Sequence, residues 1–238
     1  MIVSGYPDDD HHRDVQGGAA RPAVFGASDG LVSNVLLIIG MAGADASASV
    51  VRTAGIAGLM AGAISMASGE YVSVKAQNEL VERELARERK AIEEDPEEET
   101  EELAQLYVER GMPRAQALEM ARLLMENPEI ALEVHAREEL GVAPGELASP
   151  LGASLSSFGA FVAGAFVPLV PWLIGSGTAA TWASVILGVV GAGTIGLTLA
   201  LMTKRPPWRS ISRHVFIAVG AALVTYGIGN LVGEAITT

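Results

Sequence analysis

The sequence predicts an all-α integral membrane protein with five transmembrane helices and a cytoplasmic, three-helix acidic domain inserted between spans two and three. Half of its 238 residues are hydrophobic and only 18% are charged, whereas an ordinary soluble domain has about 25% charged residues. Five apolar stretches are long enough to cross a bilayer, which needs about 20 residues of helix. The acidic residues are concentrated elsewhere, since residues 75–150 hold 20 of the 28 Asp and Glu.

The composition also excludes several classes of protein. The chain has no cysteine, so disulfides and thiolate metal sites are excluded. Its net charge of −12 argues against a nucleic-acid partner, because binding to phosphates requires a basic face.

The five expected spans differ in their interruptions. The first contains Asp29, the second contains Glu70, and Pro168 and Pro171 are expected to kink the end of the third. A soluble protein with buried helices is the alternative, which five such runs disfavour. The spans are 25–44, 54–74, 155–174, 182–202 and 215–232.

The basic residues predict the orientation, because Lys and Arg are enriched in cytoplasmic loops. With a cytoplasmic N-terminus, 15 of the 16 Lys and Arg fall on the cytoplasmic side. The predicted organisation is an N-terminal cytoplasmic tail (1–22), spans one and two (23–74), the acidic metal-binding domain (75–150) and spans three to five (151–238). The C-terminus then lies outside, and we expect a multi-pass protein of a bacterial plasma membrane.

Three pairs of glycines have the GxxxG spacing that lets helix backbones approach closely in lipid. Packing within one bundle explains them, and the more specific interpretation is that they also form a surface that packs against a second copy. Because five helices leave little room for an enclosed path, we expect a homodimer. The pairs are Gly26/Gly30, Gly58/Gly62 and Gly229/Gly233.

The acidic segment predicts a continuation of the second span to residue 94 and three further helices. Asp95-Pro96 is typical of a helix start with Glu98 closing a capping box, and Gly111 of a helix end. Pro113 and Pro128 are expected to open the next two helices. The expected core residues are Leu103, Leu106, Leu118, Leu123, Leu124, Ile130, Leu132 and Leu140.

Carboxylates repeat on these helices at one-turn spacing, where like charges repel. A divalent cation bound by clustered oxygen ligands would relieve that repulsion, and a solvated acidic surface is the alternative. The N-terminal run Asp8–His12 we interpret as a disordered tail rather than a metal site. The groups are Glu84 with Glu88, Glu98 and Glu99 with Glu102, Glu129 with Glu133, and His135 with Glu139.

Ionisable residues inside spans are costly and indicate function. Asp29 lies about one turn into the first span, and Glu70 lies near the cytoplasmic end of the second. Met66 precedes Glu70 by four residues and shares its helix face. Two carboxylates and a thioether suit Fe²⁺ or Mn²⁺. Alternatively, Met66 only packs and Glu70 extends to the membrane interface.

These residues belong to two longer motifs, FGASDGLV at 25–32 and AGAISMASGEYVS at 61–73. Both resemble the vacuolar iron transporter family, the iron/manganese transporters of yeast and plants and their bacterial relatives, from about Arg21 onward. The resemblance implies a five-span homodimer that moves Fe²⁺, and often Mn²⁺, out of the cytosol in exchange for protons. It also implies a path at the dimer interface, and metal collection by cytoplasmic glutamates.

Carried over residue by residue, the resemblance assigns the path to Asp29 and Met66, with Glu70 typical of the bacterial branch. It assigns the cytoplasmic ligands to Glu88, Glu99, Glu102 and Glu139. The chain departs from the plant pattern at Gly58 and Ala91, which stand where plant members carry glutamates. It departs again at His135 and Ala136, which replace two methionines, and His135 with Glu139 is then a possible ligand pair.

The expected function is therefore a divalent metal exporter and not an enzyme. Its expected partners are metal ions, protons, the lipid bilayer and a second copy. A ferroxidase is one alternative, but di-iron sites typically use Glu-x-x-His, and Glu133-Val-His135 has the wrong spacing. A membrane-anchored metal sensor or store is the other.

Overall fold

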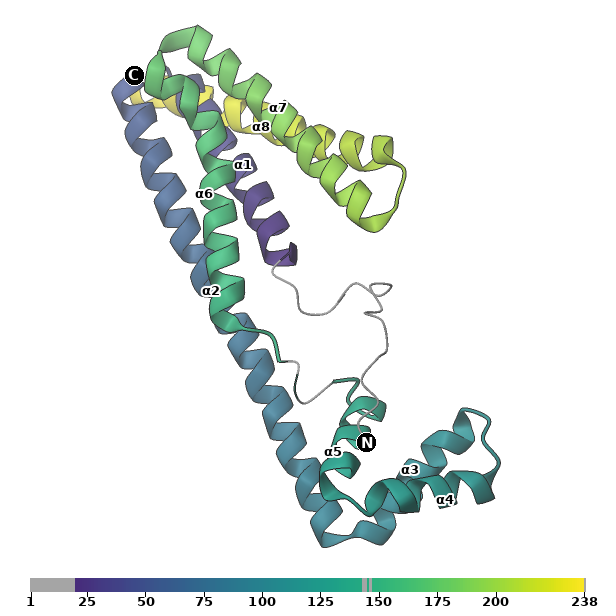
Figure 1. Ribbon diagram of the computed structural model, residues 1–238. Coiled ribbons are helices and arrows are strands. Elements are labelled where there is room, and N and C mark those ends of the chain that lie inside the picture. The colour runs from purple at the N-terminus through teal and green to yellow at the C-terminus, as the bar shows by residue number, and fades with distance from the viewer. Residues whose placement is uncertain (1–19, 143–144, 146, 238) are drawn as a thin grey trace, which may run out of the picture. The chain divides into compact units, whose positions relative to one another are not determined.

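The computed structural model describes residues 20–142, 145 and 147–237, so the N-terminal run Asp8–His12 and most of the predicted tail lie outside it. The described residues form helices and no strands, which confirms the all-α prediction. The helices are α1 (Ala20–Gly43), α2 (Ala48–Glu94), α3 (Pro96–Glu109), α4 (Arg114–Met125), α5 (Pro128–Glu138), α6 (Pro150–Ile174), α7 (Gly177–Thr203) and α8 (Pro207–Thr237) (Figure 1).

Five of these helices, α1, α2, α6, α7 and α8, are long and apolar enough to span a membrane, as predicted. They extend beyond the predicted spans; α7, for example, begins at Gly177 rather than at 182. The reason is that hydropathy marks only the apolar centre of a helix, whereas small and hydroxylated residues such as Thr178 and Thr181 continue it. Helix α2 runs unbroken from Ala48 to Glu94, as expected for a segment without glycine or proline after residue 69.

The chain forms two compact units. The acidic unit contains residues 73–149, and the membrane unit contains residues 20–72 and 150–237. Helix α2 contributes residues to both.

Within the membrane unit, α1 packs against α6, α7 and α8. The contact with α6 includes a buried hydrogen bond from Asn34 Nδ2 to the Ala165 carbonyl at 2.6 Å. A core cluster joins α1, α2 and α6 through Ile38, Leu59 and Phe161. Helix α1 is therefore the central helix of this unit.

Helix α6 continues through both prolines to Ile174. Its carbonyl end is capped by Arg52 of α2, whose Nε donates to the Trp172 carbonyl at 2.6 Å and whose Nη2 donates to the Gly175 carbonyl at 3.2 Å. Cations stabilise the C-terminal ends of helices, so the single Lys or Arg expected on the far side of the membrane has a structural use.

The three GxxxG pairs all pack within the chain. Gly26 and Gly30 face the α6 backbone at Ser157 and Phe161, and Gly58 and Gly62 face the side chains of Leu37 and Phe161. Gly229 faces the α1 backbone at Gly40, and Gly233 faces the backbone of Ala44, which directly follows α1. Packing within one bundle therefore accounts for these glycines.

The acidic unit shows the predicted helix boundaries to within two residues. Asp95 caps α3 by accepting a hydrogen bond from the Glu98 amide at 3.3 Å, and Pro96 occupies the first turn. Asn127 caps α5 in the same way through the Glu129 amide at 3.0 Å. Gly111, at a positive φ of 95°, follows the end of α3.

The core of this unit differs from the prediction. Leu103 and Leu132 are buried as expected, but Leu123, Ile130 and Leu140 are exposed. Alanines take their place, because α3, α4 and α5 pack through fully buried alanines that allow close contact. These are Ala117, Ala121, Ala131 and Ala136.

The close contact between α8 and α1 gives a first prediction. A Cβ at Gly229 would collide with the Gly40 carbonyl, whereas a Cβ at Gly227 would meet nothing within 4 Å. Gly229→Ala should lower the free energy of unfolding by about 1–3 kcal/mol through overpacking. Gly227→Ala in the same helix should raise it by about 0.5–1 kcal/mol, because alanine favours helix.

Thermal or detergent-induced unfolding of the purified protein measures both variants. Equal stability of the two would show that α8 does not approach α1 at Gly40.

Candidate metal centre

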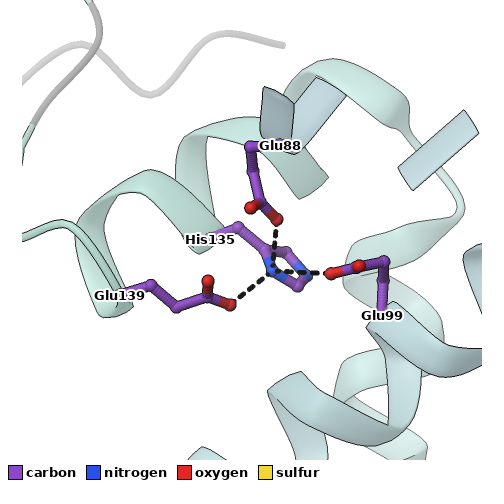
Figure 2. Close-up of side chains that lie close together, drawn as sticks. All are labelled: Glu88, Glu99, His135 and Glu139. Atoms are coloured by element: carbon purple, nitrogen blue, oxygen red, sulfur yellow. Dashed lines mark hydrogen bonds and ion pairs between the residues drawn. The ribbon is translucent and has the colours of Figure 1, made fainter. Parts of the chain in front are cut away.

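Four side chains of the acidic unit converge on one point. Glu88 comes from α2, Glu99 from α3, His135 from α5, and Glu139 from the residue that caps α5. Each offers a ligand atom, and these atoms all lie within 4.8 Å of one another. Figure 2 shows the three carboxylates turned toward the imidazole ring. Among the residues that the structure describes, this is the one cluster of three or more His, Asp and Glu that could hold a metal ion.

One nitrogen, His135 Nδ1, is the common neighbour of the three carboxylates. It lies 2.8 Å from Glu139 Oε1, 2.9 Å from Glu88 Oε1 and 3.7 Å from Glu99 Oε2. An imidazole nitrogen carries at most one proton and can donate it to one acceptor. The Glu139 contact has hydrogen-bond geometry, whereas Glu88 Oε1 is buried without a hydrogen bond. The cluster therefore contains more acceptors than its own donor can satisfy.

Burial increases the cost of this arrangement. The His135 side chain is fully buried, and its Nε2 has no hydrogen-bond partner among the residues that the structure describes. The side chains of Glu88 and Glu99 are only 15% and 12% exposed. Polar groups in such surroundings are normally paired.

These surroundings raise the pKa values of two of the carboxylates. Burial raises the pKa of Glu99 from 4.5 to about 6, with a further contribution from the charge of Glu88. Burial also raises the pKa of Glu88, and the charge of Glu139 adds to that effect. His135 opposes both shifts without cancelling them. A bound cation would act in the opposite direction, because opposite charge favours the ionised carboxylates.

The donor set defines the chemistry available at this point. Three carboxylate oxygens and one imidazole nitrogen form a hard-to-borderline set that suits Fe²⁺, Mn²⁺ and Zn²⁺. We therefore name Glu88, Glu99, His135 and Glu139 the candidate metal centre.

Two other predicted ligands lie outside this centre. Glu84 forms an ion pair with Arg87 at 3.0 Å, which neutralises its charge. Glu102 is exposed and contributes no ligand atom, but its charge raises the pKa values of Glu88 and Glu99.

The predicted path residues lie in the membrane unit. Asp29 is exposed on α1, and its backbone carbonyl accepts a hydrogen bond from Ser33 Oγ at 2.5 Å. Met66 is half-buried against the core cluster of α1, α2 and α6, and Glu70 is half-buried one turn later.

Sequence reasoning missed one polar residue of this unit. Asn34 is 2% exposed and its Oδ1 has no hydrogen-bond partner. The only sign of this residue in the sequence is a single amide side chain within an apolar span.

Comparison with known proteins identifies the family. The sequence model of the VIT family matches residues 20–230. The chain belongs to the VIT family. It is 33% identical to vacuolar iron transporter 1 of Arabidopsis thaliana over 227 residues, covering 94% of this chain and 91% of the relative. It is 37% identical to the vacuolar iron transporter of Acanthamoeba castellanii over 230 residues, covering 95% and 81%.

A vacuolar iron transporter of Toxoplasma gondii is 32% identical over 232 residues, covering 93% of this VIT-family chain and 77% of the relative. The names of these relatives confirm the resemblance and describe transporters rather than enzymes. They contradict the expected plasma-membrane location, because each relative is named for the vacuole. The predicted plasma-membrane location was therefore wrong. The Lys and Arg of the loops predict how a protein is oriented in a membrane but not in which membrane it lies.

The raised pKa values give a prediction for the metal-free protein. The folded state keeps its carboxyl protons to a higher pH than the unfolded chain, so stability falls as the pH rises from 4.5 to about 6. Glu99→Gln removes this penalty. It should raise the melting temperature at about pH 7.5 and leave it nearly unchanged at about pH 4, where Glu99 is mostly protonated in both the folded and the unfolded state.

The melting temperatures are measured in the presence of a chelator. Glu119→Gln, at an exposed position on α4, is the control and should show no such pH-dependent gain. A loss of stability in Glu99→Gln near neutral pH would contradict the repulsion inferred for the centre.

Proposed function

We propose that this protein transports Fe²⁺, and also Mn²⁺, out of the cytosol across a vacuolar-type membrane in exchange for protons. The candidate metal centre is the single observation that carries the proposal, because it offers an excess of buried carboxylates to a cation. Membership of the VIT family and the iron in the names of its relatives support the choice of cargo.

The acidic unit acts in this proposal as the cytoplasmic metal-binding domain inserted between spans two and three. The N-terminus lies on the same side and the C-terminus on the other. The distribution of Lys and Arg supports this orientation. Metal first binds Glu88, Glu99, His135 and Glu139, while Glu102 adds negative charge that attracts it and Glu84 remains paired with Arg87.

The metal then passes to Asp29, Met66 and Glu70 in the membrane unit. A carboxylate that exchanges a metal ion for a proton couples the two movements. The exposure of Asp29 supports a homodimer, because an ionisable side chain that faces lipid within a span is costly. A second copy packed against the exposed side of α1 would shield it and would form the path between the two first helices.

Metal binding is tested at His135. His135→Gln preserves a polar side chain of similar size but removes the shared nitrogen, so the affinity for Mn²⁺ or anaerobic Fe²⁺ should fall by at least about tenfold. His214→Gln, which changes the other imidazole of the described residues, is the control and should bind like the wild type. Calorimetric titration measures both, with helix content checked by circular dichroism. Equal affinities would favour a solvated acidic surface.

Transport is tested at Asp29. In proteoliposomes with an acidic lumen, Asp29→Asn should lower Fe²⁺ flux by at least about tenfold, because it removes the charge that exchanges metal for proton. It should still bind metal at the acidic unit. Glu119→Gln should transport at the wild-type rate. Flux is followed with a metal-sensitive dye inside the vesicles.

Full flux in Asp29→Asn would defeat the proposed path. Metal binding without flux in the wild-type protein would favour a sensor or store. Oxygen consumption during Fe²⁺ turnover would favour a ferroxidase.

A further inference from the structure

The membrane unit contains a cavity that takes no part in the proposed transport path. It has a volume of about 580 Å³ and lies between α1, α7 and α8, with Trp172 of α6 in its wall. Sites for small ligands have volumes of about 300–1,000 Å³ and mainly apolar walls with a few polar groups. The cavity matches that description in size and in lining.

The wall is apolar along the middle of the helices and polar at one end. Leu31 and Val35 of α1 and Ala218 and Ala222 of α8 line the apolar part. The polar groups are Asp45, just after α1, and Thr178 and Thr181 in the first turns of α7. These positions lie at helix ends, where a spanning helix reaches the membrane surface. The cavity is therefore amphiphilic, with its polar end at the edge of the membrane unit.

The cavity is open to the surface that faces lipid. Trp182 and Leu223 belong to its wall, yet they are 63% and 69% exposed. Both lie on spanning helices, α7 and α8. A molecule already dissolved in the bilayer can therefore enter from the side.

Trp172 marks the depth of the polar end. It lies near the end of α6, which ends at Ile174, and it belongs to the wall of the cavity. Tryptophan is typical of the membrane interface, where its ring meets apolar and polar surroundings. In a glycerolipid, the ester groups lie at this depth, where the acyl chain meets the polar headgroup.

We infer that this cavity binds one acyl chain of a membrane glycerolipid, whose ester groups lie at the polar end of the cavity, at the depth of Trp172. The acyl chain occupies the apolar part between α1, α7 and α8, and the headgroup lies beside Asp45 and Thr178. The inference is independent of the transported ion.

The test uses Trp172 as an internal reporter. Trp182→Phe with Trp208→Phe leaves it as the only tryptophan of the three in the chain. The full-length protein is reconstituted in phosphatidylcholine vesicles with ordinary or brominated acyl chains, because bromine quenches tryptophan emission at short range. We expect brominated lipid to lower the Trp172 emission, since a ligand in such a cavity contacts its wall over most of its surface.

Variants that fill the cavity distinguish an acyl chain inside the cavity from lipid that only lies near Trp172. Ala222→Phe places a ring in the cavity, and Ala218→Phe does so one turn away on α8. Val224→Phe adds the same ring at an exposed position of α8 outside the wall. The filling variants should lose most of the quenching, whereas Val224→Phe should keep it. Circular dichroism and size-exclusion chromatography establish that each variant is folded.

Two results would overturn the inference. The first is equal Trp172 emission in ordinary and brominated lipid. The second is equal quenching in folded Ala222→Phe, Ala218→Phe and Val224→Phe, which would show that bromine reaches the indole without entering the cavity.

Discussion

Repulsion among three carboxylates around one buried imidazole nitrogen is the constraint on which the acidic unit depends. Among the described residues, no Lys or Arg contributes to the pKa values of Glu88 and Glu99, and four arginines pair with glutamates outside the centre. These are Arg87, Arg110, Arg114 and Arg137. The N-caps at Asp95 and Asn127 and the alanine-rich helix contacts hold the centre together against that repulsion. Neutralisation is then left to protons or to a bound cation, and only a cation can satisfy all three carboxylates at once.

The sequence predicts those parts of the centre that depend on local spacing. His135 and Glu139 are one helical turn apart, so their proximity follows from periodicity alone. Glu88 and Glu99 lie on other helices, and only the family resemblance joined them to that pair. Glu102 shows the limit of such a transfer. It follows Glu99 by three residues, yet it is exposed and contributes no ligand atom.

Packing was predictable in the membrane unit where it depends on small residues, and less so in the acidic unit. The GxxxG spacing marks positions of close approach, and all three pairs pack within the chain: two face a neighbouring backbone, and Gly58/Gly62 face side chains. Leucine patterning failed in the acidic unit because apolarity does not specify which face is covered, as the exposed Leu123 shows. Since the glycines are used internally, a dimer would have to use other surfaces. The exposed residues Arg21, Phe25, Asp29 and Ser33 recur every fourth position along α1 and form one such surface.

The donor set also bears on how a cargo ion is released. A transporter must bind its ion strongly enough to collect it and weakly enough to pass it on. Thiolates would hold soft and borderline metals tightly, and this chain has no cysteine. Carboxylates with one imidazole bind more weakly, but they still follow the general order in which Cu²⁺ and Zn²⁺ exceed Fe²⁺ and Mn²⁺. The order of affinities at Glu88, Glu99, His135 and Glu139 therefore follows the coordination chemistry of each metal and does not show which metal is transported. Flux through the membrane unit is the quantity that identifies the cargo.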